Sequence, residues 1–80
     1  MAAILAQIQP VAVRNQLKVY INSALAAASL APYSAALVNL SNYIVSCTAL
    51  HGLSPHAVQY IEDYVTYSWK NWRLLFVPIP

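Results

Sequence analysis

The sequence predicts an all-α protein: an antiparallel helical hairpin whose long first helix is kinked or broken at Pro32. Two observations lead to this prediction. Helix-forming residues dominate an 80-residue chain with a single glycine, and helix-breaking signals occur at only a few places. A chain of this length is expected to form one domain, residues 1–80. The breaking signals are Pro10, Pro32, the stretch HGLSPH at 51–56 and the terminal VPIP at 77–80.

The first predicted helix runs from about residue 11 to residue 50. Its one internal interruption is Pro32, which lies in the stretch SLAPYS. Proline lacks a backbone N–H, and its ring clashes with the preceding helical turn. We therefore expect the helix to bend at Pro32, or to stop and restart there.

The stretch HGLSPH predicts a tight turn over residues 51–54. Gly52 suits the left-handed position just past a helix, and Leu53 can make the apolar contact that accompanies it. Ser54 is a favourable N-cap, and Pro55 fits the first helical position, where its missing N–H costs nothing. Two helices joined by so short a connection run antiparallel.

The second predicted helix runs from about residue 55 to residue 75, and residues 77–80 are expected to form an extended arm. At 100° per residue, its polar side chains fall within one sector of about 100°. The rest of its surface is apolar or aromatic, so we expect this helix to be in contact over most of its circumference. The polar seam consists of Gln59, Glu62, Asp63, Thr66, Lys70 and Arg73.

The lengths of the two helices leave part of the first one uncovered. A second helix of about 21 residues is about 32 Å long, so it covers only the segment between Pro32 and the turn. Residues 11–31 then project beyond the hairpin, unless the chain folds back at Pro32 into a three-helix bundle. A projecting, mostly apolar segment needs neighbouring subunits or lipid.

The composition points to partners. Hydrophobic residues make up 60% of the chain and charged residues 8%, against typical values of about 45–50% and about 25%. A domain this small buries only about 60% of the surface that its unfolded chain exposes. The folded monomer is therefore expected to show a large apolar patch, which marks contact with a partner or a membrane.

Two sets of residues are candidates for subunit packing. Four alanines recur at spacings of four, three and four residues, and small residues at such spacing let another helix approach closely. An ordinary alanine-rich helix surface is the alternative interpretation. The second set is aromatic and is expected to pack within and between subunits. These sets are Ala24, Ala28, Ala31 and Ala35, and Tyr60, Tyr64, Tyr67, Trp69 and Trp72.

The four cations are candidates for contact with DNA phosphates. Arg14 and Lys18 lie one helical turn apart with no acidic residue nearby. Lys70 and Arg73 form a second pair, which can alternatively complement Glu62, Asp63 and the helix C-terminus. A formal net charge of +2 is weak in one copy, but it becomes a strong field in an array of many copies. Contacts of this kind bind double-stranded DNA without reading its sequence.

A membrane-embedded accessory subunit of a respiratory or photosynthetic complex is the alternative function. The 33 residues from Val19 to His51 carry no charge when His51 is neutral. An uncharged stretch of this length is long enough to span a bilayer. However, Asn22, Pro32, Asn39, Asn42 and several serines interrupt this stretch, and such polar groups need partners in hydrocarbon. In that case lipid would be a further partner and the location an organellar or cell membrane.

Catalysis is not expected, and neither is a cofactor or a metal. His51 and His56 flank the turn without a carboxylate or a second cysteine to complete a zinc site. Cys47 and His51 have helical i, i+4 spacing, but no basic or orienting group accompanies them. A small core residue is the more frequent role of a lone cysteine on an apolar helix.

The chain as a whole resembles the major virion protein of bacilliform archaeal viruses of the clavavirus type. The resemblance covers the long helix broken at SLAPYS (29–34), the turn HGLSPH and the aromatic helix YVTYSWKNW (64–72). It is one of overall character and includes no diagnostic motif. It implies a self-assembling coat protein, with many copies in a helical array around double-stranded DNA and basic side chains facing the genome. The expected location is then the virion.

Overall fold

The chain forms four α-helices in a computed structural model that describes residues 2–8 and 11–72. They are α1 (Ala2–Ala6), α2 (Val11–Leu25), α3 (Leu30–His51) and α4 (Pro55–Trp72). No strand occurs within these described residues. The predicted all-α class is therefore confirmed.

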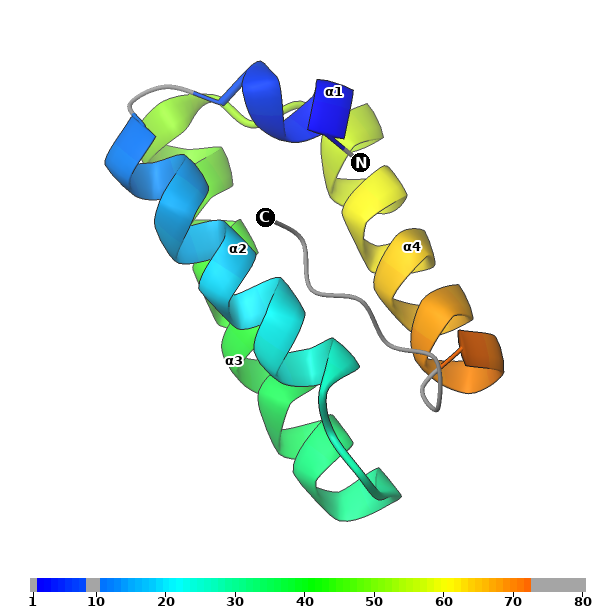
Figure 1. The fold of residues 1–80 in the computed structure, drawn as a ribbon. Helices are drawn as coiled ribbons and strands as arrows, with labels where there is room; N and C mark the ends of the chain where they lie inside the picture. Colours follow the sequence, from blue (N-terminus) through cyan, green and yellow to red (C-terminus); the bar gives the residue numbers. More distant parts are fainter. Residues whose placement is uncertain (1, 9–10, 73–80) are drawn as a thin grey trace.

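Helices α2, α3 and α4 form an up-down-up bundle. α3 runs antiparallel to α2 beside it, and α4 returns from the far end of α3, so that α2 and α4 point the same way (Figure 1). α2 packs against both α3 and α4. Of the two arrangements that the helix lengths allowed, the chain adopts the folded-back bundle, and the segment 11–25 does not project.

The break in the first predicted helix lies upstream of Pro32. α2 ends at Leu25, α3 begins at Leu30 after the extended N-cap residue Ser29, and Pro32 occupies the third helical position. The first backbone N–H groups of a helix have no intrahelical acceptor, so a proline in the first turn removes no hydrogen bond. Pro32 therefore does not kink the helix, and the interruption comprises residues 26–29.

The turn at the other end of α3 has the predicted chemistry. Gly52 adopts the left-handed conformation, with φ 65° and ψ 32°, directly after His51 ends the helix. Ser54 Oγ accepts a hydrogen bond of 3.1 Å from the backbone N–H of Ala57, which makes Ser54 the N-cap of α4. Leu53 packs against the core. The predicted helix end at 73–75 and the arm at 77–80 lie outside the described residues.

Helix α1 was not predicted from the sequence. It lies across the end of the bundle where α3 turns into α4 (Figure 1). Leu5 and Ile8 anchor this segment, because their side chains are only 1% and 6% exposed. The Arg14 guanidinium donates 3.3 Å hydrogen bonds to the carbonyl oxygens of Ala6 and Ile8. A side chain from α2 thus satisfies carbonyls at the C-terminal end of α1.

The core lies between the three long helices and under α1. Apart from Tyr33, with its hydroxyl, and Cys47, with its thiol, the buried side chains among the described residues are aliphatic, so this core depends on apolar contacts. At the end opposite α1, the rings of Tyr33 and Trp69 stack with centroids 4.0 Å apart. Trp69 Nε1 also donates a 2.8 Å hydrogen bond to the Ala27 carbonyl. The largest fully buried side chains are Leu5, Leu17, Ile21, Leu40, Ile61 and Val65.

Candidate assembly and nucleic-acid interface

An uncharged surface lies on the side of α3 that faces away from the core. α3 contains no Asp, Glu, Lys or Arg over its 22 residues. Leu30, Val38 and Val45 on this side are 66%, 58% and 67% exposed. We call this surface the α3 outer face, and its exposed residues are Leu30, Ala31, Ser34, Ala35, Val38, Ser41, Asn42, Val45, Thr48 and Ala49.

The four candidate alanines do not form one continuous stripe. Ala24 is fully buried in the core of its own chain, so it is not available to another subunit. Ala28 lies in the connection between α2 and α3, where the helical spacing is interrupted. Ala31 and Ala35 are exposed on the α3 outer face. The predicted stripe assumed an unbroken helix, and the break at residues 26–29 invalidates that assumption for its first half.

The candidate aromatic residues of α4 fall into two groups. Tyr60 and Tyr67 are 39% and 60% exposed and border the polar seam. Tyr64 and Trp69 are half-buried and pack against the core of their own chain. The Trp72 side chain lies outside the described residues. Tyr60 and Tyr67 are thus the members of this set whose position permits contact with a neighbouring subunit.

The polar seam of α4 lies on its exposed side. Gln59, Glu62, Asp63, Thr66 and Lys70 are all exposed, whereas Ile61 and Val65 on the opposite side are fully buried. Gln59 Nε2 donates a 2.7 Å hydrogen bond to Asp63 Oδ1 within the seam. An open depression beside α4 is lined by Asp63, Thr66, Tyr67, Lys70 and Asn71.

The structure places the candidate phosphate-binding cations on two helices. Arg14 is half-buried, and its hydrogen bonds hold the end of α1. Lys18, one turn further along α2, is half-buried. Lys70 is exposed on α4, and Arg73 lies outside the described residues. The two predicted pairs are therefore separate features, and Arg14 has a structural role that sequence reasoning missed.

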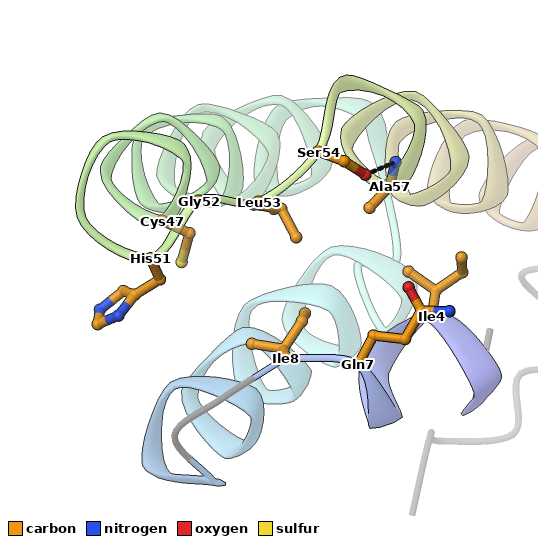
Figure 2. A pocket seen from close by; sticks show the side chains of 9 residues that line it. All are labelled: Ile4, Gln7, Ile8, Cys47, His51, Gly52, Leu53, Ser54 and Ala57. Carbon is orange, nitrogen blue, oxygen red and sulfur yellow. Dashed lines mark hydrogen bonds between the residues drawn. The ribbon is translucent and has the colours of Figure 1, made fainter.

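A cavity of about 140 Å³ lies between α1, the end of α3 and the start of α4. Figure 2 shows Ile4, Gln7 and Ile8 on one side of it, and Leu53 and Cys47 on the other. The His51 ring points outward from α3 in this view, and the residue is exposed.

The sulfur of Cys47 has an environment that favours the thiol. Cys47 is 2% exposed, and burial raises the pKa of its thiol, while a hydrogen bond with the Tyr43 hydroxyl partly offsets that rise. The pKa of Tyr43 is also raised, first by burial and then by Cys47. The ring of Tyr43 lies beside that of Tyr20, with centroids 5.0 Å apart. The thiolate is the reactive form of a cysteine, and this environment disfavours it.

Residues 2–8 and 11–72 contain no group of three or more His, Cys, Asp or Glu side chains placed to hold a metal ion. None of the described helices combines the length and the apolarity that crossing a bilayer requires.

Comparisons of this chain with protein families, with curated proteins and with solved structures find no match.

Proposed function

We propose that this protein is a self-assembling structural subunit that coats double-stranded DNA in a rod-shaped virion. The α3 outer face supports the proposal most directly, because one side of a 22-residue helix without Asp, Glu, Lys or Arg lies open on the surface. Contiguous exposed apolar surface on a small domain marks a site of association. Val11 and Val19 add exposed apolar surface on α2, so that more than one side of the bundle can meet a neighbour.

The distribution of charge is compatible with a coat that binds DNA without reading its sequence. Each copy has two more cations than anions in its formal charge. B-DNA carries one negative charge per roughly 1.7 Å of axis, so one or two phosphate contacts per copy suffice when many copies line the duplex. Lys18 and Lys70 are the described cations best suited to this role, because the Arg14 guanidinium already holds α1.

The protein is expected to leave virions without detergent as large rods or fragments of rods that contain nucleic acid. Negative-stain microscopy and the ratio of absorbance at 260 and 280 nm measure the two properties. Purified protein that lacks nucleic acid is expected to form regular assemblies in plain buffer. A freely soluble monomer at all concentrations, or recovery only as a detergent-solubilised complex with other membrane subunits, would contradict the proposal.

Replacing Lys18 by glutamine is expected to leave assembly intact and to weaken DNA binding. One lost phosphate contact per copy lowers the slope of log K against log salt by about 0.9. Binding of a duplex of random sequence, titrated between 50 and 200 mM salt, measures this slope. Lys18→Arg is the matched control because it keeps the charge and the length, and it should bind as the wild type does.

If Lys18→Gln does not change the slope of log K against log salt, Lys18 does not contact the DNA. Lys70→Gln, examined in the same way, then decides whether the exposed seam of α4 faces the duplex. Arg14→Gln is less informative, because the loss of its bonds to Ala6 and Ile8 loosens α1 as well.

A further inference from the structure

Six exposed residues of the α3 outer face follow a heptad pattern. They recur at alternating spacings of three and four residues, which is the period of the seam between two coiled helices. All six are exposed, and the β-branched valines take every second position in the middle of the pattern. We call these residues the α3 seam, and they are Ala31, Ser34, Val38, Ser41, Val45 and Thr48.

The seam is complementary to itself in one register. When two copies of α3 pack antiparallel about a two-fold axis midway between Val38 and Ser41, each seam residue meets one residue of the other chain. Val38 lies opposite Ser41 of the partner subunit, Val45 opposite the partner subunit's Ser34, and Ala31 opposite the partner's Thr48. Each of the four central layers then combines a larger side chain with a smaller one, which interdigitates well. In a parallel pair, valine meets valine and serine meets serine, so the layers alternate between wide and narrow.

We infer that the α3 seam is a homotypic docking surface, on which α3 of a second copy packs antiparallel in this register. The inference rests on the proposed function and names the contact by which its subunits meet. The partner must be as free of charge as the seam, since a charged side chain placed against it would be desolvated without a counter-ion. A second copy offers such a surface along the same length. Small side chains allow the two backbones to approach to about 8 Å.

The area that the seam can bury suits one contact of a larger array better than an isolated dimer. α3 has 22 residues and is about 33 Å long, so a strip about 10 Å wide covers roughly 330 Å². A stable dimer usually buries about 800 Å² on each partner. The α3–α3 contact alone is therefore weak, and further contacts on other sides of the bundle must add to it. Assembly is then cooperative and begins above a threshold concentration of protein.

A charge-exchange experiment tests both the surface and the register. Val45→Lys alone places an ammonium in the middle of an uncharged contact, and Ser34→Glu alone places a carboxylate there. Each is expected to raise the threshold concentration for assembly by about tenfold or more, because a buried unpaired charge costs several kcal/mol. Val45→Lys combined with Ser34→Glu is expected to restore most of the assembly, because positions 45 and 34 face each other across the antiparallel pair. Light scattering and sedimentation measure the threshold.

The matched control is Val45→Lys combined with Ala31→Glu. It has the same charges, but position 31 faces the partner's Thr48 and lies about four turns from position 45 on its own helix, so the two charges do not pair and assembly should stay impaired. Gln16→Lys is a second control, since Gln16 is exposed on α2 and lies outside the seam. It should leave the α3–α3 contact intact. Circular dichroism checks that each variant folds, and all of these positions are exposed.

The outcomes separate this inference from the proposed function. Wild-type protein that never assembles overturns both. Wild-type protein that assembles, together with a Val45→Lys variant that assembles equally well, overturns the docking surface alone. Rescue by Ala31→Glu in place of Ser34→Glu overturns this register. Flotation with phosphatidylcholine vesicles tests whether lipid covers the seam instead of a second copy. If the wild type binds the vesicles, and Val45→Lys abolishes this binding but leaves assembly unchanged, the seam is a lipid-binding surface.

Discussion

Replacing Ile61 by alanine is expected to lower the free energy of unfolding by about 2–5 kcal/mol, because the change removes buried methylene groups and leaves a cavity. Ile61 is fully buried on the inner side of α4. The total stability of an 80-residue domain is about 4–12 kcal/mol at 0.05–0.15 kcal/mol per residue. The variant should therefore unfold at a much lower urea concentration. The measurement is urea denaturation followed by circular dichroism, below the threshold for assembly.

Val45→Ala is the matched control for this loss. It also shortens a β-branched side chain, but Val45 is 67% exposed, so the change should stay within about 0.5 kcal/mol in the monomer. Equal effects of the two substitutions would mean that α4 does not pack on the bundle through Ile61.

The elements that local chemistry determines were predictable from the sequence. The turn at residues 52–54 follows from the glycine that permits a positive φ and from the serine that caps the next helix, and neither depends on distant contacts. The break near Pro32 was misplaced, because proline is compatible with the first turn of a helix as well as with a kink. The conformational preference of Pro32 alone does not decide whether it lies in the first turn of a helix or at a kink.

Features that depend on tertiary contacts were not predictable in this way. α1 is five residues long, far below the length at which an isolated helix is stable. It is held by Leu5 and Ile8 in the core and by the Arg14 guanidinium. The apolar residues in MAAILAQI have spacings that suit a helix, but the sequence does not show that a side chain from α2 reaches this segment.

The candidate surfaces also differ in whether local sequence or tertiary contacts determine them. α4 has one polar side and one apolar side, so its exposed seam could be located from helical periodicity. α3 is apolar or small all round, and periodicity alone does not distinguish its buried Leu40 and Ile44 from its exposed Val38 and Val45. Only its contacts with α2 select the inner face. For the same reason, the buried position of Ala24 became evident only from the folded bundle.

Replacing Trp69 by alanine is expected to lower the free energy of unfolding by about 3–5 kcal/mol. The indole contributes a ring stacked on Tyr33 and a hydrogen bond to the Ala27 carbonyl. The stack joins the last turns of α4 to the first turn of α3, and the hydrogen bond joins them to the connection between α2 and α3, so their loss should open this end of the bundle. Hydrogen exchange should show the greatest loss of protection at the start of α3 and the end of α4. Denaturation by urea gives the total change.

Conservative variants separate the stack from the hydrogen bond. Trp69→Phe keeps a ring against Tyr33 but removes the N–H that donates to Ala27, which should cost about 1–3 kcal/mol because a carbonyl loses its partner. Tyr33→Phe also keeps the ring, and the Tyr33 hydroxyl is buried without a hydrogen-bond partner. Its removal should be neutral or slightly stabilising, since an unsatisfied polar group leaves the interior. A loss of stability in Tyr33→Phe as large as that in Trp69→Phe would contradict the unpaired state of the Tyr33 hydroxyl.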